Sequence, residues 1–314
     1  MFKRTACPVC DESYNISSLV SLPFSSEKIR YYLDSFYCNR VDHASLAGYV
    51  YEVMKCNSCD CLYQTNVPSD SLSHSLYTEW INTDITKINH LNKPLSSFLW
   101  YAQEISTVIS VLKKNPSDVS ILDFGMGWGQ WSSMARSFGC NVIGIERSPV
   151  QIKNANQIGI SCRTDISELR NFHFDFINTE QVLEHVDSPM HILTELSSLL
   201  KPNGILKISV PYSSNPIQSL NLLDFNIPKN KRHSLNFIAP LEHINYFNPK
   251  TFSYIADRLR LKSIKLPMNI QYRSAMFLTG GTASKHILKC LLFPIWRNIL
   301  NRGNYILLQK SNLS

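Results

Sequence analysis

The chain has 314 residues, of which 44% are hydrophobic and 18% are charged, and its formal net charge is +7. This composition excludes an intrinsically disordered protein and fits two globular domains with a sizeable core. The small positive excess would attract anions, but no dense block of lysine and arginine marks a nucleic-acid footprint.

The amino-terminal run Met1–Cys7 has no apolar stretch of the kind that a signal peptide requires. No segment approaches the roughly 20 apolar residues of a membrane-spanning helix. Nine cysteines in a chain without an export signal indicate a reducing compartment, where thiols bind metal or stay free. We therefore expect a cytoplasmic protein.

The first region, residues 1–68, is rich in cysteine and contains two Cys-x-x-Cys turns. Two such turns can supply four thiolates in a tetrahedral array, which is a common ligand set of structural zinc. The rival interpretation is a redox dithiol, but the thioredoxin-like βαβ pattern is missing here. Cys38 and Cys61 leave the choice of ligands partly open. We expect a small zinc-ribbon-like domain whose metal ligands are Cys7, Cys10, Cys56 and Cys59.

Residues 69–116 are expected to form a helical connector or lid. Apolar side chains recur there at steps of three and four residues, which is typical of a helix with one face against a core. These positions are Phe98, Leu99, Ala102, Ile105, Val108, Ile109 and Leu112. The run Pro116-Ser117-Asp118 is expected to end this helix.

Residues 117–314 alternate short apolar runs with helical stretches, which indicates an α/β domain with a largely parallel sheet. The predicted strands are Val119–Phe124, Asn141–Glu146, Phe174–Asn178, Ile205–Val210, Ser263–Ile270 and Tyr305–Gln309. The predicted helices are Trp131–Phe138, Pro149–Gln157, Met190–Leu200 and Asn248–Leu259. The isolated cysteines of this region are expected to be small core residues: Cys140, Cys162 and Cys290.

A glycine-rich turn follows the first strand of this domain, with glycines at Gly125, Gly127 and Gly129. Glycine lets the chain turn sharply and lets backbone N–H groups approach a ligand. A dinucleotide fold requires Gly-x-Gly-x-x-Gly, but Gln130 stands where its last glycine belongs. Asp123 at the end of the strand would repel a pyrophosphate and suits a ligand with an ammonium group. The pattern therefore favours S-adenosylmethionine over NAD.

Further acids follow the next two strands. Glu146 ends the second strand, where a carboxylate can accept hydrogen bonds from both hydroxyls of a ribose. Asp165, after a third short strand, is placed to meet the adenine amino group, with Ile166 against the ring. Either acid alone is a commonplace at a strand end, but their order after the glycine turn favours cofactor binding.

Residues 119–250 resemble the class I S-adenosylmethionine-dependent methyltransferases. The loop Asp123–Gly129 resembles their motif I, and Glu146 resembles the acid of motif II. The run Phe174–Val186 resembles their fourth-strand signature, and Leu199–Gly204 resembles the turn before the fifth strand.

That resemblance implies a Rossmann-like sheet of seven strands, the last of them antiparallel. It also implies that the backbone near Thr179 and Glu180 flanks the methionine part of S-adenosylmethionine. The expected fold is thus an α/β methyltransferase sheet preceded by a small zinc-ribbon domain.

Two histidines are candidate catalytic groups. His185 follows the fourth strand, and His243 follows the fifth, next to Glu242. A nearby carboxylate can orient an imidazole and raise its pKa towards a range that suits a general base. The alternative is structural, because a Glu-His pair after the fourth strand caps a helix or holds the loop in many methyltransferases. We expect His243, Glu242 and His185 to be catalytic, with Tyr77 as a weaker candidate for a substrate lid.

The run Glu242-His243-x-x-Tyr246-Phe247, with Cys-x-x-Cys turns ahead of it, resembles the sugar C-methyltransferases. The stretch Cys59–Asn66 also resembles that family, although Asp60 stands where glycine is usual. The likeness implies that the Glu-His pair lies in the active site, with the histidine as candidate base. The family carries a further C-terminal domain that we do not expect here, which makes O-methylation of a sugar or polysaccharide precursor at least an equal alternative.

The segment 280–303 is a basic and very apolar insertion before the last strand. Within it, residues 285–300 could lie on a membrane interface or cover the active site. Packing against the domain core is the alternative.

We therefore expect an S-adenosylmethionine-dependent methyltransferase that acts on a sugar nucleotide, glycan precursor or related small metabolite. The alternative is a zinc-ribbon methyltransferase, or a binding module, that acts on nucleic acid or protein. Nucleic acid is the less expected partner, because a strong basic patch is missing. The sequence does not indicate the acceptor, the methylated atom or the oligomeric state.

Overall fold

The structure is a computed structural model that describes residues 1–229, 231–275, 287, 288, 290–292, 294, 295 and 305–311. Its contacts divide the chain into two compact units. Unit 1 comprises residues 1–86, 181–193 and 210–258, and unit 2 comprises residues 87–180, 194–209 and 259–314. The division of the chain near residues 68 and 116 stays a prediction.

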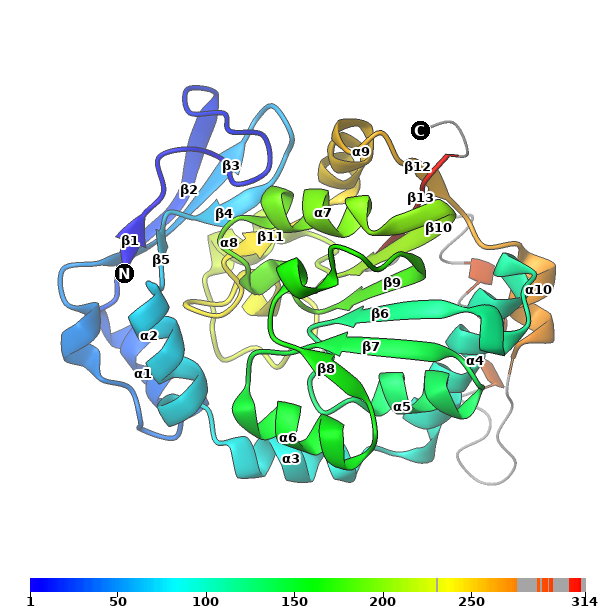
Figure 1. The fold of residues 1–314 in the computed structure, drawn as a ribbon. Helices are drawn as coiled ribbons and strands as arrows, with labels where there is room; N and C mark the ends of the chain where they lie inside the picture. Colours follow the sequence, from blue (N-terminus) through cyan, green and yellow to red (C-terminus); the bar gives the residue numbers. More distant parts are fainter. Residues whose placement is uncertain (230, 276–286, 289, 293, 296–304, 312–314) are drawn as a thin grey trace. The chain divides into compact units, whose positions relative to one another are not determined.

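Unit 2 contains seven strands: β6 (Ser120–Phe124), β7 (Asn141–Ile145), β8 (Ser161–Arg163), β9 (Phe174–Glu180), β10 (Leu200–Ser209), β12 (Lys262–Ile264) and β13 (Tyr305–Gln309). They form one sheet in the order β12-β13-β10-β9-β6-β7-β8, in which β10, β9, β6, β7 and β8 can be followed in Figure 1. The pairs β9–β10, β6–β9, β6–β7 and β7–β8 are parallel, whereas β13 is antiparallel to both of its neighbours. The predicted sheet is confirmed.

Helices and short turns connect these strands. They are α4 (Leu95–Leu112), η3 (Pro116–Asp118), α5 (Gln130–Ser137), α6 (Pro149–Gln157), η4 (Ile166–Leu169) and α10 (Met268–Arg273), and two helices have residues in both units, α3 (Thr83–Leu91) and α7 (Pro189–Ser198). The predicted strand Ser263–Ile270 is wrong in its second half. There Pro267 precedes α10, and the chain is helical from Met268.

One core of unit 2 lies between α4, α5 and the sheet. Ile105 and Val108 of α4 and Trp131 of α5 pack with strand residues such as Ile121 and Phe176. The apolar spacing that predicted a helix before Pro116 is thus the spacing of a buried face, as expected for an amphipathic helix on a sheet. The helix ends at Leu112, and the next residue, Lys113, takes a left-handed conformation.

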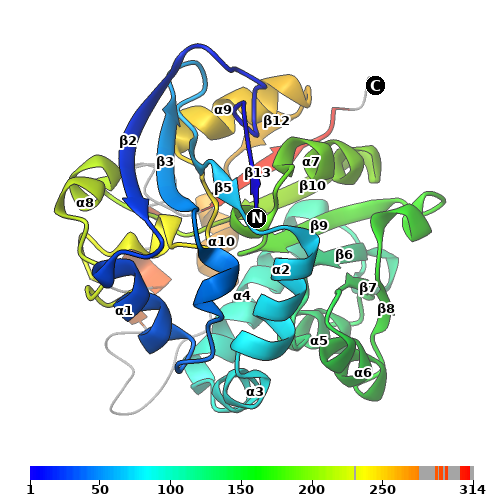
Figure 2. The ribbon, with the colours of Figure 1, turned by 90° about the vertical axis from the view of Figure 1, so that its left-hand side faces the viewer.

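Unit 1 is built on a four-stranded antiparallel sheet in the order β11-β4-β3-β2, with β2 and β3 side by side in Figure 2. Its elements are β1 (Phe2–Lys3), β2 (Ile16–Pro23), α1 (Glu27–Phe36), η1 (His43–Leu46), β3 (Val50–Cys56), β4 (Leu62–Gln64), β5 (Asn66–Val67), α2 (Asp70–Ser75), a π-turn η2 (Leu76–Trp80), η5 (Leu183–His185), α8 (Pro216–Leu222), η6 (Leu235–Ile238), β11 (Asn245–Tyr246) and α9 (Pro249–Arg258). A separate two-stranded pair joins β1 to β5.

Two features of unit 1 were not predicted from the sequence. The cysteine-rich first region includes the ten-residue helix α1. Only Ile29 and Leu33 of that helix are buried, so the apolar signal is one pair of positions four residues apart. The strand β11 completes the sheet from far along the chain, by pairing Asn245 with Tyr63.

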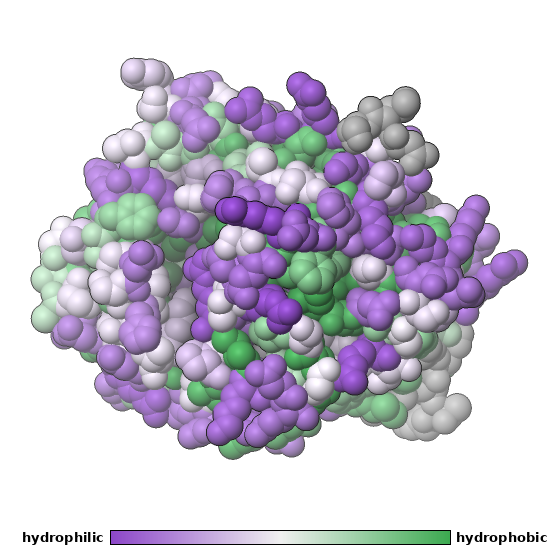
Figure 3. Space-filling model, in the orientation of Figure 1, coloured by the Kyte–Doolittle hydropathy of each residue, from purple (hydrophilic) through white to green (hydrophobic). Residues whose placement is uncertain are grey.

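Within the described part of the chain, no helix is long and apolar enough to cross a membrane. On the face that Figure 3 shows, hydrophilic side chains cover much of the surface, with hydrophobic ones in smaller groups between them. The basic apolar segment 285–300 lies mostly outside the described residues, so its membrane or lid role stays a prediction. Of its described residues, Cys290 is buried.

Phe176 tests the core of unit 2. Its side chain is 1% exposed and stacks on Trp131 at a centroid distance of 6.1 Å. We expect Phe176→Ala to lower the free energy of unfolding by about 3–5 kcal/mol, because it leaves a cavity under α5. Phe172→Ala is the control, since Phe172 is 40% exposed; we expect a loss of less than about 1 kcal/mol there. Urea denaturation measures both, and equal losses would contradict the assignment of this core.

Candidate functional site

The glycine turn joins β6 to α5 in unit 2. Gly125, Gly127 and Gly129 all have positive φ angles, of 71°, 57° and 74°. The turn is anchored because the N–H groups of Gly125 and Met126 donate to the carbonyl of Ile145, over 2.9 and 3.1 Å. A side chain at Gly129 would also meet the ends of two isoleucines at 3.2 Å. Glycine is therefore required at this turn by conformation, as the sequence analysis expected.

Glu146 lies directly beside this turn. Its Oε2 accepts the N–H of Gly127 over 2.9 Å. Its Oε1 accepts the N–H groups of Arg147 and Ser148 over 2.8 and 3.0 Å. The carboxylate is thus fixed by three backbone donors next to the glycine turn. Its contact with a ribose stays a prediction.

Asp123 is buried beneath the turn. Its Oδ2 accepts from the Ser132 hydroxyl over 2.5 Å, and its Oδ1 accepts from the Asn178 amide over 2.8 Å. Burial raises the pKa of Asp123 to about 6, although these two hydrogen bonds oppose the rise. The carboxylate therefore joins α5 and β9 to the end of β6, and a role towards an ammonium group stays a prediction.

Asp165 and Ile166 occupy the turn after β8. Asp165 is exposed and caps the helix η4, where it accepts the N–H of Ser167 over 2.8 Å. Glu168 completes a capping box by accepting the N–H of Asp165 over 3.1 Å. Ile166 is buried, with 7% exposure. Capping accounts for Asp165 in this structure, and its contact with adenine stays a prediction.

Thr179 and Glu180 end β9, where they contact a residue that the sequence analysis missed. The Thr179 hydroxyl donates to the backbone carbonyl of Lys207 over 3.0 Å. The Lys207 ammonium group, which is 4% exposed, lies 2.7 Å from Glu180 and 2.8 Å from Glu104 of α4. Burial lowers the pKa of Lys207, but the two carboxylates together have the larger effect, so the pKa is raised overall. In the sequence, Lys207 is a single lysine within the apolar run Ile205–Val210. A lysine in a buried strand is expected to pair with a carboxylate, and this pattern could have indicated the ion pair.

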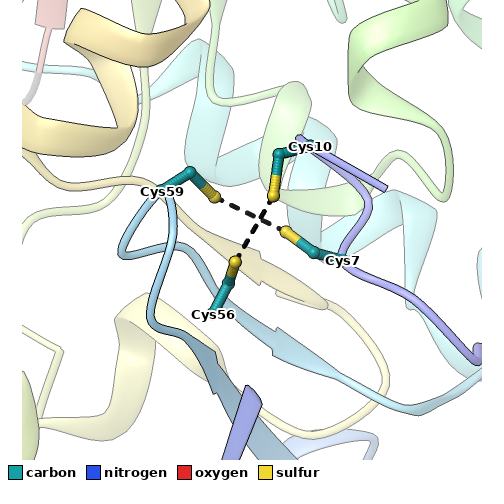
Figure 4. Close-up of side chains that lie close together, drawn as sticks. All are labelled: Cys7, Cys10, Cys56 and Cys59. Atoms are coloured by element: carbon teal, nitrogen blue, oxygen red, sulfur yellow. Dashed lines mark hydrogen bonds between the residues drawn. The ribbon is translucent and has the colours of Figure 1, made fainter. Parts of the chain in front are cut away.

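The four cysteines of the two Cys-x-x-Cys turns come together in unit 1, and Figure 4 shows their sulfur atoms pointing to a common centre. The Sγ atoms of Cys7 and Cys59 lie 3.6 Å apart, and those of Cys10 and Cys56 lie 3.3 Å apart. Thiolates around tetrahedral zinc, at about 2.3 Å from the metal, lie about 3.8 Å from one another. The donor set and its spacing therefore fit a structural zinc ion.

The two turns have the same backbone geometry. In the first, the N–H of Asp11 donates to the carbonyl of Cys7, and in the second the N–H of Asp60 donates to that of Cys56. Asp11 and Asp60 both have left-handed φ angles, of 60° and 62°. Aspartate tolerates this conformation better than most residues, which explains how Asp60 stands where glycine is usual. Cys61 is buried beside the group but is not one of its four members.

The candidate catalytic histidines also lie together in unit 1. The rings of His185 and His243 are in an edge-to-face contact with centroids 4.8 Å apart. The Nδ1 of His243 is hydrogen-bonded to the backbone carbonyl of Asn236. Because a carbonyl only accepts, Nδ1 carries the proton, and the lone pair of the ring is on Nε2. His243 thus has the tautomer that can take a proton through Nε2.

Burial is the main electrostatic influence on both rings. It lowers the pKa of His243 to about 4 and that of His185 to about 3, with His243 and Lys229 contributing to the latter. A hydrogen bond from the His185 ring to the carbonyl of Glu242 opposes the second shift. The hydroxyl of Tyr77 lies 3.4 Å from Nδ1 of His185. Both imidazoles are therefore neutral at neutral pH, which is the form that a general base requires.

Glu242 does not lie where the sequence analysis placed it, as the partner of the His243 ring. Lys229, and Tyr37 in the loop after α1, instead lie close enough to its carboxylate to lower its pKa. Burial nevertheless raises the pKa of Glu242 to about 7. The sequence did not predict the roles of Tyr37, Lys229 and Asn236, because no local pattern relates these residues to the Glu-His pair.

Glu184 joins the two histidines in a group whose ligand atoms lie within 4.8 Å of one another. The Nε2 of His185 lies 3.9 Å from Oε1 of Glu184. The His185 ring also has the hydrogen bond to Glu242 described above. A buried carboxylate thus lies beside the two candidate catalytic rings.

A cavity of about 240 Å³ lies in unit 1 beside these residues. One part of its wall is aromatic, with Tyr32 at centroid distances of 5.6 Å from Phe36 and 5.3 Å from Phe225. Lys229 lies over the Phe36 ring at 4.7 Å and brings a positive charge. Asn236, whose carbonyl holds His243, also lines the cavity. The cavity thus combines apolar ring surfaces, one cation and a link to the candidate base.

Comparison with known proteins gives a match to the family described as "Methyltransferase domain" over residues 100–263, just over half of the chain. The ubiquinone biosynthesis O-methyltransferase of Actinobacillus pleuropneumoniae serotype 7 is 28% identical over 145 residues, which is 40% of this chain and 62% of that protein. The enzyme of the same name from Rickettsia typhi is 28% identical over 195 residues, or 55% of this chain and 72% of that protein.

Among solved structures, the plantazolicin methyltransferase BpumL with a pentazolic desmethylPZN analog and SAH is 16% identical with a TM-score of 0.47. That match covers 76% of this chain and 95% of BpumL. The sarcosine dimethylglycine methyltransferase homologue from Galdieria sulphuraria is 18% identical with a TM-score of 0.40, over 69% of this chain and 86% of that one.

The cysteine group predicts about one zinc ion per folded chain, as four thiolates close one structural site. Elemental analysis of purified protein measures it. We expect Cys56→Ser to lose most of this zinc, and Cys61→Ser to retain it because Cys61 lies outside the group of four. Cys140→Ser is the control, since Cys140 is an isolated buried cysteine of unit 2. A folded wild-type protein without metal would overturn the zinc assignment.

Proposed function

Because the chain belongs to the S-adenosylmethionine-dependent methyltransferases, we propose that it transfers the methyl group to a hydroxyl of a small, anionic, ring-containing acceptor. A sugar nucleotide or a glycan precursor has this chemistry. The observation that carries the proposal is the cavity of unit 1, where an aromatic wall and Lys229 adjoin the residue that orients His243.

The methyl donor is assigned to the glycine turn of unit 2. The backbone there has positive φ angles at Gly125, Gly127 and Gly129, and no side chain at these positions covers it. Glu146 is fixed beside Gly127 by its hydrogen bonds. A carboxylate held in this way suits the two ribose hydroxyls of S-adenosylmethionine. The buried Asp123 supports the turn from below through Ser132.

The acceptor is assigned to unit 1. Sugar and base rings present apolar faces that pack on aromatic side chains such as Tyr32 and Phe225, and Lys229 suits a phosphate. The relatives from Actinobacillus and Rickettsia are named as O-methyltransferases, which supports a hydroxyl acceptor. This chain spans only 62% of the first of them, so their substrate is not carried over.

His243 is the proposed general base. S-adenosylmethionine supplies an electrophilic methyl group on a sulfonium. The Nε2 lone pair of His243 accepts the proton of the acceptor hydroxyl while the hydroxyl oxygen attacks the methyl group in line. The neutral thioether leaves, and the proton stays on the imidazole. The carbonyl of Asn236 holds the tautomer, and the neutral ring of His185 packs against it without adding charge.

The four-cysteine site is proposed to hold structural zinc. Cys7, Cys10, Cys56 and Cys59 would close the coordination sphere, which leaves no open position for chemistry. The metal would join the amino terminus to the turn before β4.

The donor assignment predicts that Glu146→Ala weakens binding of S-adenosylmethionine by about 10- to 100-fold, since two hydrogen bonds to a carboxylate are lost. Isothermal titration calorimetry measures the dissociation constant. Asp118→Asn is the control, because Asp118 is an exposed acid of the same unit that lies before β6. Unchanged affinity in Glu146→Ala would remove Glu146 from the ribose role.

The base assignment predicts that His243→Gln lowers kcat by about 100-fold or more while binding of S-adenosylmethionine is kept. Transfer of radiolabelled methyl to a panel of nucleoside diphosphate sugars measures it. With the pKa of His243 near 4, the wild-type rate should stay flat from neutral pH down to mildly acidic pH and fall only as the ring protonates. A variant with full activity on the same acceptor would exclude His243 as the base. Salt-sensitive binding of RNA with no turnover of any sugar nucleotide would favour the nucleic-acid alternative.

A further inference from the structure

Arg4 occupies an unusual position in unit 1, three residues before the first metal-site cysteine. Its guanidinium group donates to Oδ1 of Asn245 over 2.8 Å and to the carbonyl of Asp187 over 2.7 Å. Longer contacts of 3.4 Å reach the carbonyls of Gln64, Val186 and Ile244. Two of the contacted segments, at residues 186–187 and 244–245, are more than fifty residues apart in the sequence.

These two segments carry the candidate catalytic histidines. Residues 183–187 include His185, and residues 243–245 include His243. Asn245 joins them, because its amide donates to the carbonyls of Leu183 and Val186 over 3.0 and 2.6 Å. The N–H of Ile244 adds a bond to the carbonyl of Glu184 over 2.8 Å. These bonds join the two segments whose imidazole rings are in contact.

Arg4 is held from both sides along the chain. On one side Lys3 pairs with Asn66 in the β1–β5 ladder, and the N–H of Arg4 donates to the carbonyl of Thr65 over 2.7 Å. On the other side, Cys7 begins the first Cys-x-x-Cys turn, which the metal site closes. A bound metal therefore limits the freedom of the short stretch that carries Arg4.

Arginine suits this position for a chemical reason. A guanidinium group has five N–H donors in a rigid fork and can satisfy several carbonyls at once, whereas a lysine ammonium is a point charge on a flexible stem. The acceptors here are mainly backbone carbonyls and an amide oxygen, so geometry matters more than charge. A substitution that keeps only the charge should fail to replace Arg4.

We propose that Arg4 is a positioning residue that links the four-cysteine metal site to the acceptor-side histidines. The metal fixes the chain at Arg4, and Arg4 with Asn245 fixes the segments that carry His185 and His243, so that the His243 ring stays on the Asn236 carbonyl that sets its tautomer. The proposal rests on the proposed function of His243. The tautomer itself can be measured whether or not His243 proves to be the base.

The experiment is nitrogen NMR of the histidine rings in zinc-loaded, full-length protein labelled at histidine. His243→Gln identifies the signal by its loss. In the wild type we expect one fixed tautomer with the proton on Nδ1. In Arg4→Lys, and in Arg4→Ala, we expect mixed tautomers and an increase in the pKa of His243 towards that of a free imidazole, while zinc content and binding of S-adenosylmethionine stay within about twofold of wild type.

Arg136→Lys is the matched control. Arg136 also donates to two backbone carbonyls, those of Ile158 and Gly159, over 2.9 and 2.6 Å, but it lies in unit 2. We expect it to leave the His243 signals unchanged. Added ethylguanidinium should restore the fixed tautomer in Arg4→Ala, because it replaces the missing fork; a general loss of packing would not respond to it.

Removal of the metal by a chelator should give the same mixed tautomers as Arg4→Ala, with binding of S-adenosylmethionine retained as the sign that unit 2 is folded. A fixed Nδ1–H tautomer in Arg4→Lys and Arg4→Ala would overturn the positioning role. A fixed tautomer in protein shown to be free of metal would overturn the link to the cysteine site. Loss of turnover in His243→Gln bears only on the proposed base, so the two ideas fail separately.

Discussion

A buried carbonyl group needs a hydrogen-bond donor, and in unit 1 this requirement decides where the irregular segments lie. The segments 183–187 and 236–244 form little regular structure, so side chains from distant parts of the chain supply the donors. The Tyr51 hydroxyl donates to Ile238 over 2.8 Å, and the Gln64 amide donates to Ala239 and His243 over 2.8 and 3.0 Å. Arg4 and Asn245 do the same for the other segment. The candidate catalytic groups are thus held by a polar framework built on the small antiparallel sheet.

The two acids near the glycine turn show how burial separates residues of similar chemistry. Asp123 is enclosed, accepts from two side chains and has its pKa raised to about 6. Glu146 is held by backbone N–H groups at the end of β7. Both acids were expected to contact the ligand because both end a strand. In the structure Asp123 contacts Ser132 and Asn178, whereas Glu146 contacts the N–H of Gly127. The contact of either acid with a ligand stays a prediction.

The sheet of unit 2 and the cysteine group could be predicted from the sequence, since both follow from short-range patterns. A strand, a glycine turn and a helix lie within twenty residues of one another, and each Cys-x-x-Cys turn is a local structure. The partners of the site could not be predicted. Lys207 with Glu104, Tyr37 with Glu242 and Arg4 with Asn245 meet only after distant segments have packed. No periodicity in the sequence indicates such pairs, because each partner is a single residue outside any repeating pattern.

The pairing of β11 with β4 has a consequence for how the protein folds during synthesis. The strand β4 can pair with β11 only after Asn245 has been synthesised, because Asn245 pairs with Tyr63. The chain between these two residues contains most of unit 2. Contacts of such large sequence separation form slowly, because the entropy of a long loop is lost before the contact is gained. While the ribosome is still adding the later strands, the Cys-x-x-Cys turns are already available, and early metal capture would keep the exposed edge of β4 ordered until its last partner emerges.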